Sequence, residues 1–286
     1  MRIRRQRNLA CPDRMAALLQ KSGGRPNKPN IHIISIAMKT SIMHPEVSVI
    51  VPTLDEERYL ERTLASIATQ NTNTPYELII ADGASTDGGM SIAERYTDVI
   101  IQCEEKGIGA GRHCGAKHAR GRYLMFIDAD TILPCYYIAW LCDRFTDRDL
   151  VAFSASFGFS EQSQSAKLAE KVTNQYLTMR DKVLEPTLPG FNTCVRKDAY
   201  FESGGYRNVP LEDIEFSRRI SQIGKTRYFD DVVVITSPRR LDGMGLLGTL
   251  YYYTQLDLGR AIDGSMIDKM SKKLGIADLR DYVGIR

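Results

Sequence analysis

The sequence predicts an α/β fold built on a mainly parallel sheet that is flanked by helices. From Val47 onward, short apolar runs alternate with helix-like stretches. Such runs are typical of strands buried on both faces, and their alternation with helices is that of βαβ units. The chain has 286 residues, of which 43% are hydrophobic, and can therefore bury a substantial core. The length fits one large domain or two small ones, and we treat it as a single domain of two halves.

The elements are most regular in the first half. We expect strands at 47–51, 77–80, 99–101 and 124–127, with helices between them at 57–69, 89–96 and 111–119. The second half is less regular. It predicts helices at 134–145, 166–184 and 212–223 and strands at 150–153, 226–229 and 232–235. Parallel strands end at the same edge of a sheet, and ligands bind there, so the loops that follow the strands are the candidate site.

The two ends of the chain differ from the predicted domain. Residues 1–46 are basic and irregular, and we treat them as a flexible N-terminal extension. Residues 47–240 form the predicted domain, and residues 241–286 form a predicted helical tail. An apolar stretch at 246–253 lies in that tail. It either packs on the protein's own core or lies on a lipid surface, and the sequence leaves both open.

Composition narrows the classes of partner and the compartment. The net charge is +3, from 38 basic and 35 acidic residues, so we expect no nucleic acid. The six cysteines form no CxxC pair, and reduced thiols are expected. There is no signal-peptide pattern and no apolar run near the roughly 20 residues that span a bilayer. We therefore expect a cytoplasmic protein, with peripheral contact at the cytoplasmic membrane face as the open alternative.

Two carboxylates follow the predicted strand at 124–127. Asp128 and Asp130 are two residues apart, a spacing that places side chains on one side of an extended chain. Mg²⁺ and Mn²⁺ prefer oxygen ligands, usually one or two carboxylates completed by water and phosphates. The pattern therefore fits a metal that carries a nucleotide diphosphate. An Asx turn, with Asp130 capping the next helix, explains the same residues equally well.

The loops after the first two strands are polar. The first, at 52–57, contains no glycine, which argues against a dinucleotide fold, and the chain has no P-loop. The second begins at Asp82, which is placed to accept hydrogen bonds from a base or ribose. Ser85, Thr86 and Asp87 follow, and their alternative role is to form the turn and cap the next helix.

Three further features belong to the candidate site. Arg112 precedes the strand at 124–127 and is a candidate for binding a diphosphate. Glycine-containing turns at 189–193 and 204–206 either approach a ligand or are ordinary connectors. Glu212 and Asp213 stand at a predicted helix start. Glu212 is a candidate for binding the substrate, although the helix dipole favours acids there even without a functional role.

The segments VIVPTLDEE (49–57), DGASTD (82–87), DAD (128–130) and ED (212–213), in this order, resemble the family 2 glycosyltransferases with the GT-A fold. The resemblance covers roughly residues 47–238. It implies a Rossmann-like sheet with a nucleotide-binding half and an acceptor half. It also implies transfer of a sugar from a nucleotide-diphosphate donor, with UDP favoured over GDP by family habit.

The resemblance also implies the role of each matching residue. Pro52, Thr53, Glu56 and Asp82 would hold the nucleotide. Asp128 and Asp130 would match the DXD motif and hold Mn²⁺ or Mg²⁺ together with the diphosphate. Asp213, after Glu212, would be the base that deprotonates an acceptor hydroxyl, which implies inversion at the anomeric carbon.

Two departures limit the resemblance. The QxxRW signature of processive synthases is absent, so we expect one sugar per encounter. No histidine follows His118, although some relatives supply a late histidine to the metal. Arg239 and Arg240 either approach the diphosphate instead or form a solvated basic turn. The acceptor, whether a glycan, a lipid-linked molecule or a small molecule, is not specified. A non-catalytic nucleotide-sugar binder of the same fold is the alternative function. A nucleotidyltransferase is less well supported, because the glycine- and lysine-rich phosphate loop usual in that class is missing after the first strand.

Overall fold

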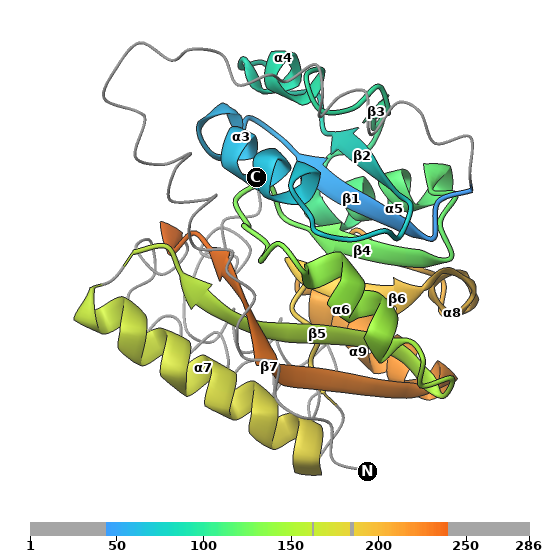
Figure 1. Ribbon diagram of the computed structural model, residues 1–286, viewed down its shortest axis with the longest axis vertical. Coiled ribbons are helices and arrows are strands. Elements are labelled where there is room, and N and C mark those ends of the chain that lie inside the picture. Colours follow the sequence, from blue (N-terminus) through green and yellow to red (C-terminus); the bar gives the residue numbers. More distant parts are fainter. Residues whose placement is uncertain (1–43, 162, 184–185, 240–286) are drawn as a thin grey trace, which may run out of the picture. The chain divides into compact units, whose positions relative to one another are not determined.

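The computed structural model describes residues 44–161, 163–183 and 186–239 (Figure 1). Their strands form one seven-stranded sheet with the order β3-β2-β1-β4-β6-β5-β7. The predicted α/β class with a mainly parallel sheet is confirmed. Residues 1–43 of the predicted extension, Arg240 and the tail at 241–286 lie outside the described residues.

The first half follows the predicted βαβ order closely. Strands β1, β2, β3 and β4 are parallel neighbours, because β2 pairs with both β1 and β3 and β1 also pairs with β4. The elements are β1 (Val47–Thr53), α3 (Glu57–Ala68), β2 (Tyr76–Asp82), α4 (Gly89–Ala93), β3 (Ile100–Gln102), α5 (Ile108–His118) and β4 (Tyr123–Ile127). Every residue of β1 and β4 is buried, which is why these strands read as unbroken apolar runs.

The second half contains both parallel and antiparallel pairs. The elements are α6 (Tyr137–Arg144), β5 (Leu150–Phe159), α7 (Gln164–Val183), β6 (Asn192–Arg196), α8 (Lys197–Glu202), α9 (Glu212–Ile223) and β7 (Lys225–Thr236). Strand β6 runs antiparallel to both β4 and β5, whereas β7 runs parallel to β5. Strand β6 therefore joins the two halves into one sheet.

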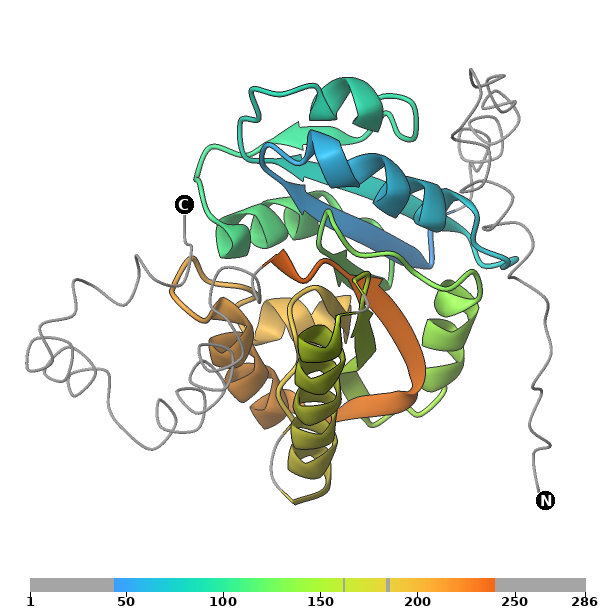
Figure 2. The same ribbon diagram turned by 90° about the vertical axis from the view of Figure 1, so that its left-hand side faces the viewer.

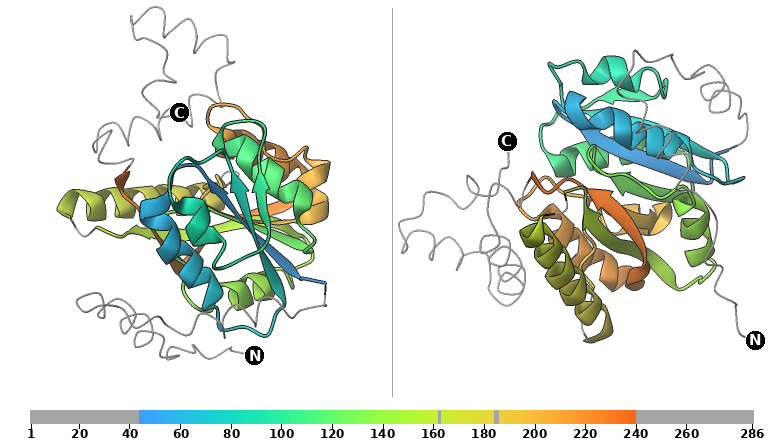
Figure 3. Two further views of the ribbon diagram at one scale, coloured as in Figure 1. Left: turned by 90° about the horizontal axis from the view of Figure 1, so that it is seen from above. Right: turned by 60° about the vertical axis from the view of Figure 1, so that its left-hand side comes forward.

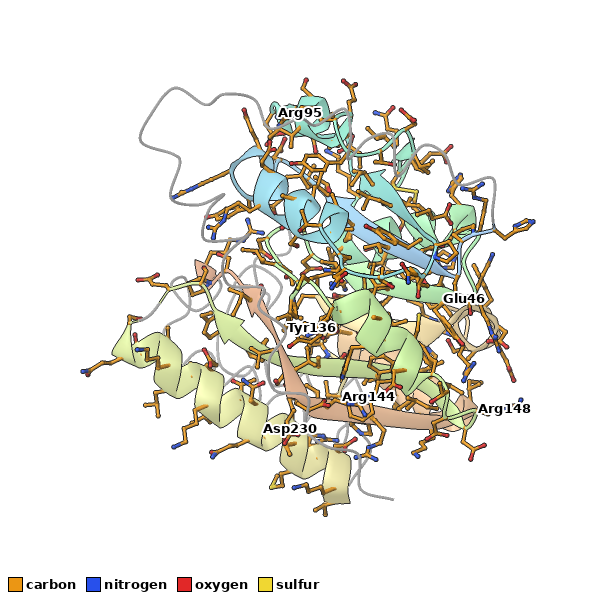
Figure 4. The ribbon with its side chains drawn as sticks, in the orientation of Figure 1. Glu46, Arg95, Tyr136, Arg144, Arg148 and Asp230 are labelled. Atoms are coloured by element: carbon orange, nitrogen blue, oxygen red, sulfur yellow. A yellow bond between two sulfur atoms is a disulfide. The ribbon has the colours of Figure 1, made fainter. Side chains whose placement is uncertain are left out.

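The helices cover both faces of the sheet (Figure 3). Helices α5, α8 and α9 share one face, where residues such as Ala116, Tyr200 and Phe216 pack on Ile50 and Phe126. Helices α3 and α6 lie on the opposite face (Figures 2 and 3). On α6, Arg144 points toward β7 (Figure 4), where it pairs with Asp231 and lies 4.7 Å from the centre of the Phe229 ring. None of the described helices combines the length and the apolar character needed to span a membrane.

Several predicted elements needed correction. The strands expected at 226–229 and 232–235 are one strand, β7, with an irregular register opposite Ala155 and Ser156. The segment at 189–193 was predicted to be a turn, but strand β6 begins within it, at Asn192. Only the residues up to Phe191 form the turn. Helix α6 begins at Tyr137 with Tyr136 as its N-cap, so Asp130 does not cap it.

The expectation of reduced thiols was wrong for three of the described cysteines, because Cys135 and the pair Cys103 and Cys114 are disulfide-bonded. Cys103 directly follows β3, and Cys114 lies on α5, the helix packed against β1 and β2. Their Cα atoms are 6.1 Å apart, and the two sulfurs form a disulfide. Among the described cysteines, Cys142 and Cys194 are free thiols.

Candidate active site

The loops after β1 and β2 are joined to each other by reciprocal hydrogen bonds. The Asp55 N–H donates to Ser85 Oγ over 3.0 Å, and the Thr86 N–H donates to the Asp55 carboxylate over 2.7 Å. The Glu57 N–H donates to Asp87 over 2.8 Å. The backbone N–H of Thr86 is the main reason why the pKa of Asp55 lies below its usual value. The 85–87 segment therefore links the two loops, and Gly88 rather than Asp87 is the N-cap of α4.

Asp82 and Thr53 end the two strands side by side. They are paired in the register of β1 and β2, and both are buried. The Asp82 carboxylate accepts the Ser85 hydroxyl over 2.6 Å and the Ser85 N–H over 3.1 Å. Pro52 precedes Thr53 and faces Gly111 on α5, where a Cβ would lie only 3.2 Å from the Pro52 Cβ. The predicted nucleotide residues at 52, 53 and 82 are thus gathered at one edge of the sheet.

Backbone strain is concentrated in the loops that surround this edge. Within the described residues, the non-glycine residues with positive φ are Asp55 at 52°, Ala84 at 70° and Leu211 at 57°. They lie in the loop after β1, in the loop after β2 and immediately before Glu212. Non-glycine residues seldom adopt this conformation, and where they do the strain is often part of a functional site. This distribution supports the same three loops that the sequence selected.

Arg112 on α5 is buried between two acids. Its Nη2 donates to Asp128 Oδ1 over 2.8 Å, and its Nη1 donates to Glu212 Oε1 over 2.6 Å. Only 2% of the Arg112 side chain is exposed. Burial by itself would lower the pKa of Arg112, but the charges of Asp128 and Glu212 outweigh burial and raise it. Arg112 therefore stays charged and fixes both carboxylates.

Two glycine-containing turns form the pocket around Arg112. A Cβ on Gly190 would lie 2.5 Å from Arg112 Nη1, so the turn before β6 needs glycine to make room for the guanidinium. Gly204 and Gly205 have positive φ and turn the chain so that the Tyr206 ring lies 5.0 Å from the guanidinium. Sequence reasoning named both turns but not Arg112 as the group they enclose, since that contact joins distant segments.

A second arginine lies between the other aspartate and the first loop. Arg239 Nε is 3.0 Å from Asp130 Oδ2, and its Nη1 and Nη2 donate to Glu56 over 2.8 Å and 2.5 Å. The guanidinium also lies 5.0 Å from the centre of the Tyr59 ring. In contrast to Arg112, 42% of the Arg239 side chain is exposed. Burial opposes the charge of Arg239, but hydrogen bonding to Glu56 and the charge of Asp130 raise its pKa.

Asp130 is also connected to the end of β7. Thr236 Oγ1 donates to Asp130 Oδ1 over 3.4 Å, and Thr131 Oγ1 donates to Thr236 Oγ1 over 3.3 Å. Thr236 carried no recognisable signal in the sequence, because only the fold brings the end of β7 next to β4. The same applies to Tyr59.

Glu212 and Asp213 form the first turn of α9, as predicted. The helix dipole alone does not explain Glu212, because Glu212 also forms an ion pair with the buried Arg112. Asp213 is half-buried and accepts the Ile214 N–H over 2.9 Å. Since Arg112 fixes Glu212, it also fixes the turn that carries Asp213.

The acids at the end of β4 have the chemistry of hard-cation ligands. Arg112 uses Oδ1 of Asp128, and among the described residues nothing donates to Oδ2. The Asp130 carboxylate is reached by a partly exposed arginine that a cation would have to replace. One or two carboxylates are sufficient when phosphates and water complete the shell, so this donor set fits Mn²⁺ or Mg²⁺. No cluster of three or more His, Cys, Asp or Glu side chains is arranged for a metal within the described part of the chain.

Comparison with known proteins identifies the family of this architecture. Residues 48–202, more than half of the chain, match the family model for glycosyl transferase family 2. The glycosyltransferase AglE of Haloferax volcanii is 25% identical over 208 residues, which are 68% of each chain.

Solved structures share the fold. The mannosyltransferase PcManGT of Pyrobaculum calidifontis, solved with GDP-Man and Mn²⁺, has a TM-score of 0.58 at 20% identity and matches 79% of this chain and 76% of its own. Glucosyl-3-phosphoglycerate synthase of Mycobacterium tuberculosis, solved with Mn²⁺ and UDP-Glc, has a TM-score of 0.53 at 20% identity and matches 82% and 84%. These likenesses confirm the GT-A fold that the resemblance implied.

Proposed function

Because the chain belongs to glycosyl transferase family 2, we propose that it moves one sugar from a nucleotide-diphosphate donor to an acceptor hydroxyl with inversion at the anomeric carbon. The observation that carries this proposal is the meeting of four loops around two guanidinium groups. The loops after β1, β2 and β4 and the start of α9 converge there. The resemblance assigns these segments to the donor and the acceptor.

The donor nucleotide binds along the ends of β1 and β2. Asp82, held by Ser85, accepts hydrogen bonds from the base or ribose, and Pro52 and Thr53 form the adjacent wall. The bonds that link the 55–57 and 85–88 segments keep both loops in place before the ligand arrives. The structural neighbours were solved with either GDP-Man or UDP-Glc, so we keep UDP as a family expectation and leave GDP as its alternative.

Asp130 and Asp128 are the proposed ligands of a divalent cation. Mn²⁺ or Mg²⁺ would neutralise the charge that develops on the departing nucleoside diphosphate. The neighbours solved with Mn²⁺ support this choice. Arg112 holds Asp128 in position from the buried side, which makes it a positioning residue rather than a direct phosphate ligand.

Arg239 is the residue that changes partner in this proposal. In the absence of donor it neutralises Asp130 and Glu56 and spans the proposed diphosphate site. With a cation on Asp130, Arg239 would be free to turn its planar donors to the diphosphate, an acceptor that guanidinium groups bind well. Glu56 then becomes free to contact the donor. Arg239 thus acts on the diphosphate directly, whereas the late histidine of some relatives binds the metal.

Asp213 is the proposed general base. It takes the proton of the acceptor hydroxyl as the oxygen attacks the anomeric carbon and the bond to the diphosphate breaks. Attack from the side opposite the leaving group inverts that carbon. The pair formed by Glu212 and Arg112 holds the first turn of α9 and therefore the position of Asp213.

The direct test is release of nucleoside diphosphate from UDP- and GDP-sugars in the presence of Mn²⁺ and a panel of glycan, lipid-linked and small-molecule acceptors. We expect acceptor-dependent release, a single product, and loss of release in Asp213→Asn. NMR of the first product should show the inverted anomer, and a retained anomer would exclude this mechanism. Donor binding without release of nucleoside diphosphate in the presence of any acceptor would instead support the non-catalytic nucleotide-sugar binder.

A further inference from the structure

Helix α7 carries an apolar stripe on its outer side. Leu168, Val172, Met179 and Val183 are 49%, 36%, 53% and 74% exposed. Their spacings of four, seven and four residues place them along one line of a helix. Scattered exposed apolar residues are normal on a protein surface, whereas a continuous line of them marks an interaction site.

This stripe is not the face that holds α7 to the sheet. The buried side consists of Ala166, Ala169, Thr173, Leu177 and Arg180. Asn174 reinforces it by bonding to both backbone groups of Phe157 and to the Tyr228 hydroxyl. Helix α7 is therefore anchored on β5 and β7, with its other side turned away from the sheet (Figure 2).

Charge is also divided between the two sides of α7. Its acids point inward, where Glu170 accepts the Phe159 N–H and Asp181 pairs with Arg227. Its exposed lysines, Lys167, Lys171 and Lys182, each immediately precede a residue of the apolar stripe. No acidic side chain pairs with these lysines among the described residues. The outer side therefore combines apolar groups with positive charge that is not balanced within the helix.

The position of α7 connects this surface to the proposed active site. Ala166 and Ala169, near the start of α7, pack against Phe159 at the end of β5. Phe159 is the register partner of Thr236, and Thr236 contacts Asp130. Helix α7 therefore packs on the two strands, β5 and β7, whose ends lie next to the candidate site. A partner bound to the outer side of α7 would lie near that site.

We propose that the outer side of α7 docks on an anionic lipid surface. A helix with apolar residues beside a row of lysines has the composition that places helices at the boundary between headgroups and acyl chains. Lysine stems extend along apolar surface while their ammonium groups reach lipid phosphates. The unbalanced positive charge favours this partner over a second copy of the chain, whose α7 would present the same charge. The proposal does not depend on sugar transfer, because it concerns a separate surface.

Flotation of the full-length protein with vesicles tests the proposal without donor or acceptor. We expect binding to vesicles that contain phosphatidylglycerol, weak binding to pure phosphatidylcholine, and release at high salt. Lys167→Gln, Lys171→Gln and Lys182→Gln together should weaken binding on the order of 100-fold, since each basic residue near an anionic surface contributes roughly 1 kcal/mol, or about five-fold. Leu168→Ser, Val172→Ser and Met179→Ser together should abolish it.

Matched variants control for charge and hydrophobicity in general. Arg62→Gln, Lys117→Gln and Arg148→Gln remove the same charge from exposed positions elsewhere, and Phe201→Ser with Val209→Ser removes exposed apolar groups elsewhere. Both control sets should float like the parent. Equal flotation of the α7 variants and the parent would overturn the proposal. Two other results for the apolar variant would also overturn it. Loss of self-association alone, measured by light scattering, would show that the stripe binds a second copy, and loss of thermal stability alone would show that it packs against the chain itself.

Discussion

The two aspartates after β4 are held by arginines in opposite environments. Arg112 joins Asp128 to Glu212 inside the protein, with 2% of its side chain exposed. Arg239 joins Asp130 to Glu56 at the surface, with 42% exposed. Each cluster contains one guanidinium and two carboxylates, so the chemistry is the same and only the access differs. The comparison indicates that the buried cluster is a fixed frame and that the open cluster is exchangeable.

Stability should separate the two clusters most clearly. Arg112→Met leaves two acids without their buried partner, and we expect a loss of about 3–5 kcal/mol in the free energy of unfolding. Arg239→Met removes a partly exposed pair, which solvent screens, and should cost about 0–1 kcal/mol. Urea denaturation of both variants measures the difference. Similar losses in the two would show that the clusters are not distinct.

The next effect concerns the acid beside the buried cluster. Asp213→Asn should lower turnover by about 10²–10⁴-fold, the usual contribution of a general base, while donor affinity stays near that of the parent. Glu215→Gln is the matched control, because Glu215 lies in the same helical turn but pairs with Arg219. Turnover and calorimetric donor affinity are the two measurements. Parallel loss of both in Asp213→Asn would point to a binding role instead of a base.

Much of this site was predictable from the sequence, because its acids stand directly after apolar runs. Asp82 ends a buried strand, Asp128 and Asp130 follow another, and their approximate positions come from strand order alone. The partners of these acids were harder to predict. Arg112 was expected to face a diphosphate, but it is enclosed by Gly190 and Tyr206, and both contacts depend on tertiary packing.

The least predictable region was the second half. Strand β6 is only five residues long and begins beside glycine and proline, so its pattern was that of a turn. Its place between β4 and β5 depends on antiparallel pairing with both strands. Thr236 and Arg239 reach Asp130 only because β7 ends beside the loop after β4. The cytoplasmic location and the roles of the site residues stay predictions.

The open cluster makes a prediction about competition. Arg239→Gln removes the cation that sits against Asp130, so Mn²⁺ should bind the donor-free variant more tightly than the parent. The same variant should bind nucleoside diphosphates roughly 10- to 100-fold more weakly, since a hydrogen bond from a charged group contributes about 1.5–3 kcal/mol. Electron paramagnetic resonance of free Mn²⁺ measures the metal affinity, and calorimetry measures the affinity for nucleoside diphosphates. If neither affinity changes, Arg239 only forms surface ion pairs and has no role in donor binding.

The smallest expected effect is the pH response of the loops near the open cluster. The pKa of Asp55 is lowered in the folded state by the Thr86 N–H. Its stabilising contribution is therefore present above its ordinary value of 3.8 and is lost as the pH falls through the lower folded value. Stability measured against pH should fall less steeply in acid for Asp55→Asn than for the parent. An unchanged slope would show that this contact does not link the loops.

Calorimetric titration of UDP-sugars and GDP-sugars into the full-length protein, with Mn²⁺ and with chelator, tests the central claim most directly. The claim is that Asp130 belongs to an exchangeable donor site. One nucleotide should bind in a metal-dependent way, Asp130→Asn should lose that dependence, and Asp143→Asn, an exposed acid on α6, should behave like the parent. Binding that is equally tight with chelator and in Asp130→Asn would contradict the claim.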